Sequence, residues 1–456
     1  MNLSELYLNI KTVTFASLVC QTDVQTPDDV TNYQQQGHQM MFTETDFRSQ
    51  FPGVDPSRIF YSPSLSLSCL YFNKESLAVC PFHIEMFSMG IGGFTVEKFL
   101  AVARKSETEV AGGEYLRSIL LLPDAMQLEY FDMLIAKKNV PDLYQLFFSV
   151  YTESDYGFKL LNKDTLRTIF DSKTDEDKKL TAEKMEFLPD TIKVFRGENT
   201  ESTPHSESYS WTTDINVANF FATRRGNGPG YIIEGEVDKA DIIEVLLDDR
   251  SESELIVPPE KVRILEVHSL HGMDFLKEII PIVAPVYRKY RDEMDELDFA
   301  QESSIHGRDH QARVLLLTQM ISQLLDLPMS DRKILAAAAI FHDTQRTNDW
   351  VDASHGKASA DYYARQFKHP DPIVMFLCEY HCPPDDEAYR HIKNNRVLSK
   401  SRSKAKLLYD VFCDSDSLDR IRLPGGIKEL DMNQLRLEIS RQLPLVARIC
   451  LEQVKV

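Results

Sequence analysis

The run "SDRKILAAAAIFHDTQR", residues 330–346, holds the longest apolar stretch of the chain and closes it with a histidine and an aspartate. Its apolar residues recur at helical spacing, so the run predicts a helix over Asp331 to His342, with Ser330 as a candidate N-cap. The apolar stretch, residues 334–341, is far shorter than the roughly 20 residues that cross a bilayer. The run therefore predicts a buried helix of a folded domain, with His342 and Asp343 at its end.

Most of the chain's histidines lie around this helix, because seven of the twelve fall between residues 306 and 391. Helical spacing places His310, His342, His381 and Asp416 each on an apolar helix face. A carboxylate on such a face is costly unless it is paired or bound to a metal. A cation shared by four helices is the simplest explanation of the set, and the sequence therefore predicts a metal centre in a helical domain.

The segments that carry these residues resemble the HD superfamily of metal-dependent phosphohydrolases, an all-helical fold whose ligands follow the order His, His-Asp, Asp. The matching segments are residues 342–346, "DASHGKASA" at 352–360 and "DSDSLDR" at 414–420. The resemblance implies one or two divalent ions (Mn, Fe, Zn, Ni or Mg) and a nucleotide or an ADP-ribose-type substrate. It also implies a ligand set of His310, His342, Asp343 and Asp416, with His355 and His381 as the added ligands of two-metal members.

Alternatives remain for parts of this set. His306 and Arg346 either contact a substrate phosphate or cap a helix. The whole set is alternatively the core of a helical bundle that holds no metal.

Residues 193–267 follow a different pattern, in which short apolar strands alternate with Gly, Pro, Asn and Asp. The predicted strands are "IKVFRG" (192–197), "SYSWTT" (208–213), "GYIIEGEV" (230–237), "ADIIEVLL" (240–247) and "SELIVP" (253–258), with one short helix at 215–224. This pattern is typical of a compact β-rich or α+β domain. Because residues two apart on a strand share a face, we expect Ser210 beside Thr212 and Glu252 beside Glu254.

Three pieces of this segment, "VFRG" at 194–197, "SWT" at 210–212 and "SESELIVPP" at 251–259, resemble mono-ADP-ribosyltransferases of the Arg–Ser–Glu class. The resemblance covers about residues 140–270, with Ser-Trp-Thr in place of the usual Ser-Thr-Ser. It implies NAD as substrate and a protein acceptor, with arginine favoured by the E-x-E form. The alternative is that these charged residues lie on the surface of an unrelated β-domain.

The resemblance also assigns roles to the motif residues. Glu254 would stabilise the oxocarbenium-like ribose that forms when the nicotinamide bond breaks, and Glu252 would orient and deprotonate the acceptor. Arg196 would pair with an NAD phosphate, which suits its forked donors. The remaining implied NAD-site residues are Gly197, Ser210 and Thr212, and the two hydroxyls would brace Arg196 and Glu254.

Composition limits the classes of partner. The net charge of −19 disfavours nucleic acid and anionic lipid surfaces as partners. Seven cysteines without a CxxC pair make a disulfide framework or a structural zinc module improbable and favour a reducing compartment. No membrane span is expected, which predicts a cytoplasmic protein or one that a dedicated machine secretes into a host cell.

These patterns predict a multi-domain α+β fold, with a β-rich ADP-ribosyltransferase domain followed by an all-α HD domain. The predicted division is an N-terminal region of unknown role (1–140), a transferase-like domain (141–285) and a phosphohydrolase-like helical domain (286–456), with a boundary near residues 285 to 300. The predicted protein is a bifunctional enzyme, by analogy a bacterial toxin or effector. The alternative is an interaction protein whose HD domain hydrolyses an independent nucleotide and whose transferase module is a remnant that binds or hydrolyses NAD.

Overall fold

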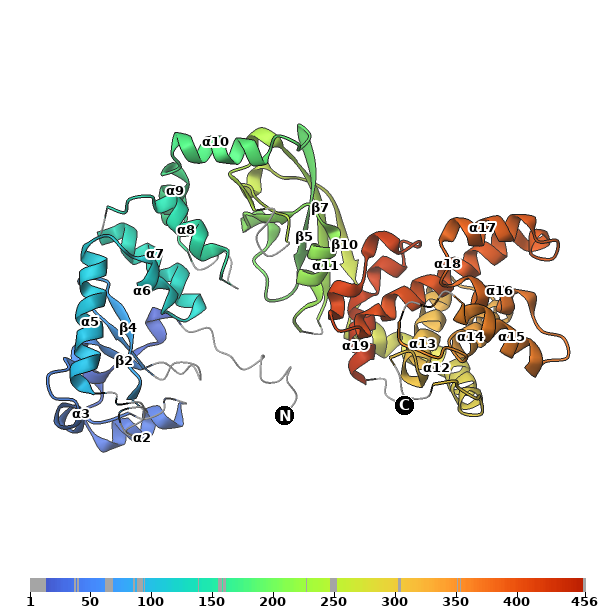
Figure 1. The fold of residues 1–456 in the computed structure, drawn as a ribbon, viewed down its shortest axis with the longest axis horizontal. Helices are drawn as coiled ribbons and strands as arrows, with labels where there is room; N and C mark the ends of the chain where they lie inside the picture. The colour runs from blue at the N-terminus through green and yellow to red at the C-terminus, as the bar shows by residue number, and fades with distance from the viewer. Residues whose placement is uncertain are drawn as a thin grey trace. The chain divides into compact units, whose positions relative to one another are not determined.

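The computed structural model describes residues 14–36, 38, 41–61, 69–84, 87, 93, 95–137, 139–154, 158, 161–226, 228–246, 252–301, 305–350, 352 and 354–453 (Figure 1). The chain is mixed α+β, with antiparallel sheets in its N-terminal and central regions and a mostly helical C-terminal region. It forms two compact units, Met1–Glu186 and Phe187–Val456. No described helix combines the length and the apolar character needed to span a membrane.

The first unit contains a small antiparallel sheet followed by helices. The sheet order is β1 (Val19–Cys20), β2 (Ile59–Tyr61), β3 (Cys69–Phe72) and β4 (Val79–Pro81). The helices are α2 (Pro27–Gln35), α3 (Glu44–Gln50), α5 (Val96–Ala111), α6 (Leu116–Leu120), α7 (Asp124–Lys137), α8 (Leu143–Tyr151), α9 (Lys163–Asp171) and α10 (Asp175–Lys184). Phenylalanines such as Phe47, Phe51 and Phe82 are buried against one another and form the core around the sheet.

The second unit begins with a six-stranded antiparallel sheet whose order is β10-β7-β5-β6-β9-β8. Its strands are β5 (Thr191–Glu198), β6 (Ser210–Thr212), β7 (Gly230–Asp238), β8 (Glu244–Leu246), β9 (Glu254–Ile256) and β10 (Arg263–Leu270). The five predicted strands are confirmed, as is the short helix, α11 (Ile215–Thr223). Strand β10 was not predicted, because Arg263, Glu266 and His268 mask its alternation and its residues are largely exposed.

The helical part of this unit packs directly onto the sheet. Its helices are α12 (Met273–Asp295), α13 (Arg308–Leu324), α14 (Met329–Phe341), α15 (His355–Gln366), α16 (Pro372–Tyr380), α17 (Asp385–Asn394), α18 (Arg402–Leu418) and α19 (Pro444–Gln453). One apolar core joins Ala218 and Ala222 of α11 to the helices. The backbone N–H of Met432 donates to the Asn216 side chain at 2.7 Å, and that of His271 donates to the Gln442 carbonyl at 2.8 Å.

These compact units differ from the predicted three-part division. Residue 140 lies between α7 and α8 inside the first unit, and residue 285 lies within α12, which continues to Asp295. The predicted change from strands to helices is real, but a continuous helix and a shared core join the two parts. Composition therefore located the change of secondary structure, whereas the packing that unites the sheet and the helices came from tertiary contacts.

The start of α14 also differs from expectation. The helix begins at Met329 after Pro328, so Ser330 is not its N-cap. The Ser330 hydroxyl donates to the Asp331 carboxylate at 3.0 Å rather than capping a backbone N–H, and the backbone N–H of Asp331 reaches the Pro328 carbonyl at 2.9 Å. A residue before the serine therefore sets the helix start, while the helix ends as predicted at His342, its C-cap.

Candidate functional site

The six predicted metal ligands come from five helices of the second unit and meet at one place. His310 lies in the first turn of α13, Asp416 lies near the end of α18, and His355 begins α15. The others directly follow helices, with His342 and Asp343 after α14 and His381 after α16. His310, His342, Asp343 and His355 are buried. Asp416 is partly exposed, with 27% of its side-chain surface accessible, and Ala405, Leu408 and Phe412 on the same helix face are buried.

The first group of ligand atoms surrounds His310, and we call it the first cation position. His310 Nε2 lies 3.2 Å from His342 Nε2, 3.2 Å from Asp416 Oδ1 and 3.6 Å from Asp343 Oδ2. His342 Nε2 lies 3.8 Å from the same Asp343 oxygen. The three ligand atoms of His310, His342 and Asp416 all lie within 4.8 Å of one another, which suits coordination of a single ion.

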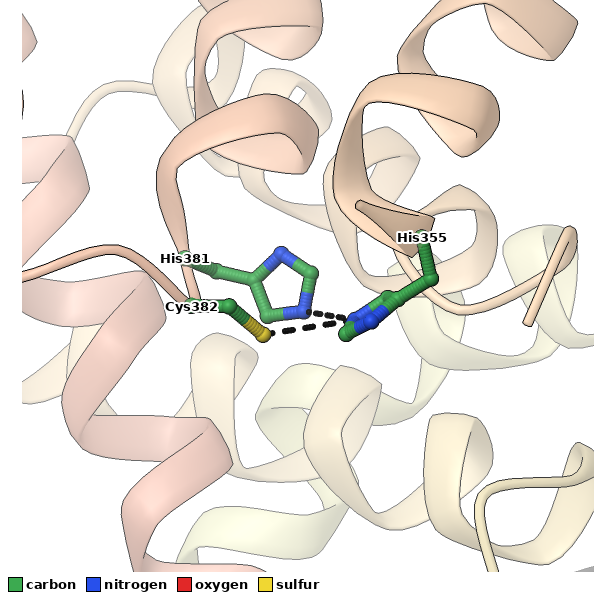
Figure 2. A group of neighbouring side chains, drawn as sticks. All are labelled: His355, His381 and Cys382. Carbon is green, nitrogen blue, oxygen red and sulfur yellow. Dashed lines mark hydrogen bonds between the residues drawn. The ribbon is translucent and has the colours of Figure 1, made fainter. Parts of the chain in front are cut away.

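The second group, which we call the second cation position, uses the other oxygen of Asp343. His355 Nε2 lies 2.9 Å and His381 Nε2 3.5 Å from Asp343 Oδ1, and the two nitrogens are 3.0 Å apart. Cys382 lies beside this pair, with its Sγ 3.3 Å from His355 Nε2 (Figure 2). Asp343 therefore has one oxygen directed to each position.

Close packing of α15 on α16 brings His355 to His381. At Gly356, a Cβ would lie 2.5 Å from the Cys378 carbonyl oxygen and 3.0 Å from that of Glu379. Real side chains do not tolerate such approaches, so the glycine after His355 allows the two helices to meet. The His-Gly pair in the sequence thus has a geometric reason.

In their neutral forms, the imidazoles direct the lone pairs of their Nε2 atoms at one another. The Nδ1 atom of each ring faces an oxygen. For His310 this is the carboxylate oxygen Asp419 Oδ2, at 2.7 Å. For the other three it is a backbone carbonyl oxygen, of Ala339 for His342 (2.9 Å), of Cys378 for His381 (2.8 Å) and of Asp352 for His355. Because carbonyl and carboxylate oxygens only accept, Nδ1 carries the proton and Nε2 is a lone pair in the neutral ring. Moreover, buried Asp343 Oδ1 accepts no hydrogen bond from the described residues. Converging Nε2 and carboxylate oxygen atoms fit a divalent ion, which would displace any proton between them.

The pKa values divide the imidazoles into two groups. Side-chain contacts with Asp343 and Cys382 outweigh burial and raise the pKa of His355 to about 9, and they hold the pKa of His381 well above its usual value, so these two rings carry a second proton until an ion displaces it. Burial lowers the pKa of His342 to about 3, so its ring stays neutral and able to bind a metal.

Burial raises the pKa of Asp343, but the contacts with His306, His355 and His381 outweigh it and hold that pKa well below its usual range. Asp416 likewise has a lowered pKa, because its contact with His310 outweighs its burial. Both carboxylates are therefore charged.

Sequence reasoning missed the pair that supports His310. Asp419 accepts from Arg313 Nε at 2.6 Å and from Arg313 Nη2 at 3.1 Å, and it faces His310 Nδ1 at 2.7 Å. A carboxylate behind a ligating histidine fixes the ring and its tautomer. The signal was present in the "DSDSLDR" run, whose last aspartate is Asp419, although the partner Arg313 lies 106 residues away in the chain.

His306 and Arg346 both lie at the centre. His306 Nδ1 is 3.2 Å from Asp343 Oδ2 and 3.0 Å from Arg422 Nη2, while Gly307 is the N-cap of α13. Arg346 Nη1 lies 3.9 Å from Asp343 Oδ1, and its other nitrogens donate to the carbonyls of Asn348 and Trp350. Two guanidinium groups, Arg346 and Arg422, therefore border a centre that is otherwise rich in carboxylates.

The second candidate site lies on the sheet, where adjacent strands β5, β6 and β9 bring the motif residues together. Arg196 Nη1 donates to the Ser210 carbonyl at 2.9 Å, and the Ser210 hydroxyl donates to Glu254 Oε1. Opposite positions on the strands are Phe195 and Thr212, and Thr212 and Glu254. Glu254 is 9% exposed. Ser210 therefore connects Arg196 with Glu254, through its backbone carbonyl on one side and its hydroxyl on the other.

The Thr212 hydroxyl has a different partner from the one that the resemblance implied, and Glu252 lies before the strand that carries Glu254. Thr212 donates its one hydroxyl proton to the Glu252 carbonyl at 2.7 Å, so it holds the backbone before β9 and cannot also donate to Glu254. Ser253 has a φ of 46° and β9 begins only at Glu254. The rule that residues two apart on a strand share a face therefore does not extend to Glu252, because Ser253 has a left-handed backbone conformation and interrupts the strand.

Two further features surround Arg196. Its Nε donates to Glu198 Oε1 at 3.1 Å and its Nη2 to the Thr203 carbonyl at 2.8 Å, so Glu198 is a partner that sequence reasoning missed. At Gly197, a Cβ would lie 1.8 Å from the Ala218 carbonyl oxygen. The glycine therefore allows α11 to pack against β5, and this packing requirement is independent of any contact with a ligand.

No protein-family model, curated protein or solved structure matches this chain.

Proposed function

We propose that the centre between α13 and α18 is a metal-dependent phosphohydrolase site. The observation that carries the proposal is the convergence of four imidazole Nε2 atoms and two charged carboxylates, with Nδ1 of each ring already committed to an oxygen. A cation relieves the repulsion between these lone pairs, and two ions bridged by a carboxylate suit phosphoryl chemistry. The arginines at its border suit an anionic substrate.

The chain's own residues would divide the work. His310, His342, Asp343 and Asp416 would hold the first ion, and His355 and His381, with the other Asp343 oxygen, the second. Bound ions of this kind polarise a phosphoryl oxygen and lower the pKa of water. Asp419 and Arg313 keep His310 oriented, and Arg422 and Arg346 place positive charge where a phosphate would approach.

The test uses the metal-stripped full-length chain. It is assayed for phosphate or nucleotide release from phosphomonoesters, phosphodiesters, nucleotides and ADP-ribose, after addition of Mn²⁺, Fe²⁺, Zn²⁺, Ni²⁺ or Mg²⁺. Metal-dependent release from at least one substrate class, together with bound metal by elemental analysis, supports the proposal. A chain that binds none of these ions contradicts it.

We propose a second activity, NAD-dependent mono-ADP-ribosylation of a protein acceptor, at the sheet site. The observation that favours it is the chain of contacts from Arg196 through Ser210 to the buried Glu254. Glu254 would stabilise positive charge on the ribose as the nicotinamide leaves, and Ser210 would hold its carboxylate in place. Arg196 would pair with an NAD phosphate, and Glu252 would deprotonate the acceptor, for which arginine is the expected side chain.

Labelled NAD incubated with the protein in a cell lysate tests this second activity, with and without a chelator. Labelled protein that appears in both samples supports it, because the sheet residues are not metal ligands. Label that requires the metal, or that never appears, contradicts it. If ADP-ribose also serves as a substrate of the metal centre, the label should disappear faster in the sample without chelator.

A further inference from the structure

We propose that Cys382 adds a thiolate to the imidazole and carboxylate ligands of the second cation position. This position therefore selects a thiophilic ion such as Zn²⁺ over Mg²⁺. The inference rests on the proposed metal centre and deepens it, because it assigns the donor set and the metal class of one position. Figure 2 shows Cys382 and His381 facing His355 from the segment that follows α16.

The distances match a four-coordinate site. A tetrahedral zinc ion holds two nitrogens about 3.4 Å apart, and a nitrogen and a sulfur about 3.6 Å apart, given its usual bond lengths. The corresponding distances are 3.0 Å between His355 and His381 Nε2, and 3.3 Å between His355 Nε2 and Cys382 Sγ. Asp343 Oδ1, at 2.9 Å and 3.5 Å from the two nitrogens, supplies the fourth donor. The imidazole and sulfur atoms all lie within 4.8 Å of one another.

The local backbone presents the thiol at this place. Cys382 directly follows His381, the C-cap of α16, and precedes Pro383 and Pro384. A residue before proline is largely restricted to extended conformations, so little freedom is lost when Sγ is fixed. All seven cysteines of the chain are described, and Cys382 is exposed whereas the others are buried or partly buried. Although Cys382 as a residue is exposed, its Sγ lies against the His355 imidazole, so packing in a hydrophobic core does not explain the position of the thiol.

Donor chemistry then sets the metal class. Mg²⁺ prefers oxygen ligands in octahedral geometry, whereas thiolate and imidazole donors select Zn²⁺ and similar transition ions. The first position, with two imidazoles and carboxylates, lacks a sulfur donor in the described residues. The two positions therefore differ in the metal class that they prefer.

Cobalt spectroscopy tests the assignment directly. The metal-stripped full-length chain is titrated with Co²⁺, and the near-ultraviolet thiolate-to-cobalt charge-transfer band is followed beside the weaker visible bands that report any bound Co²⁺. The variants are Cys382→Ser and, as a matched control, Cys20→Ser, which removes a partly exposed thiol in the other unit. Zn²⁺ competition on the same samples measures the affinity of each position.

We expect the charge-transfer band in the wild type and in Cys20→Ser but not in Cys382→Ser. The last variant should keep the visible bands of the first position and bind its second Zn²⁺ at least about tenfold more weakly, since even indirect partners of a metal cost about that much. Bound Co²⁺ without the band in the wild type, or a band that persists in Cys382→Ser, overturns the assignment and leaves the metal centre standing. A chain that binds no Co²⁺ overturns both.

Discussion

The sheet site and the metal centre lie in one unit but satisfy their polar groups in opposite ways. On the sheet, three nitrogens of Arg196 each donate to an oxygen, and Ser210 donates to Glu254. At the centre, imidazole Nε2 atoms face one another at 3.2 Å in one group and 3.0 Å in the other. The protein supplies the oxygen partners of the first set, whereas the facing nitrogens of the second set need a proton or a positive ion between them.

This difference separates two kinds of preorganisation. Hydrogen bonds that close on themselves hold side chains in place before a ligand arrives, so an organic ligand must compete with or extend them. Lone pairs and carboxylates held together by the fold store repulsion that a cation relieves, so ion binding and folding stability are linked. Stability should therefore respond to metal through the centre and not through the sheet.

The largest expected effect comes from Asp343→Asn. Because Asp343 directs one oxygen to each cation position, the amide should weaken both ions and lower phosphohydrolase activity at least about 10³-fold, the equivalent of several kcal/mol of lost charge stabilisation. Elemental analysis and phosphate release measure the change, and chelator-treated wild type should behave in the same way.

The matched control is Asp361→Asn on the exposed side of α15, where the carboxylate pairs only with Lys357 among the contacts described. It should keep metal and activity. If Asp343→Asn keeps the full metal content and the full rate of phosphate release, the proposal that Asp343 holds ions at the centre is wrong.

The next effect is that of Glu254→Gln, which keeps the shape and the hydrogen-bond acceptor for Ser210 but removes the charge. Labelling of protein by NAD should fall about 10²- to 10³-fold, as when one electrostatic group is removed from a transition state. Metal content should not change. Glu266→Gln on β10, at an exposed position, serves as the control and should label normally. Unchanged labelling by Glu254→Gln would remove the sheet site from the chemistry.

Some elements of the fold could be predicted from the sequence and others could not. The strands at 192–197 and 230–237 were predicted because turn residues bound them and β-branched residues fill them. Strand β10 escaped notice because its exposed, charged residues carry little apolar alternation. The predicted boundary at 285 fell inside α12, since a change in periodicity does not reveal whether two parts share a core.

The sites show the same limit. Helical periodicity pointed His310, His342 and His381 inward, because facing is a local property. The supporting residues are harder to predict. Asp419 contacts His310 and Arg313, which are distant from it in the sequence, and Glu198 contacts the motif residue Arg196. The expectation that Glu252 and Glu254 lie on one regular strand is not met, because Ser253 between them has a φ of 46°, which the residue pattern does not reveal.

Glu252→Gln should separate two steps at the sheet. If Glu252 only activates the acceptor, transfer to protein falls about 10²-fold, in line with loss of a general base, while slow hydrolysis of NAD persists. Release of nicotinamide and labelling of protein are measured on the same sample. Equal loss of both would show that the Glu252 side chain supports the site as a whole, because the substitution leaves the backbone contact with Thr212 in place. Thr212→Ser, which keeps the hydroxyl, should leave both activities near the wild-type level.

The smallest expected effect, that of Glu198→Gln, tests whether the hydrogen bonds within the sheet site compete with a ligand. Glu198 accepts from Arg196 and lies 3.4 Å from His205, so its carboxylate occupies the guanidinium that the proposed activity assigns to an NAD phosphate. In Glu198→Gln the hydrogen bond can persist, but the competing charge is gone. One charge contact is worth about 1 kcal/mol near water, so KM for NAD should fall about fivefold while kcat changes little. Glu201→Gln removes the same charge from an exposed position nearby and should leave KM unchanged. A KM that rises in Glu198→Gln would mean that the carboxylate positions Arg196 rather than competing for it, and the closed network would then be part of the binding site instead of an obstacle to it.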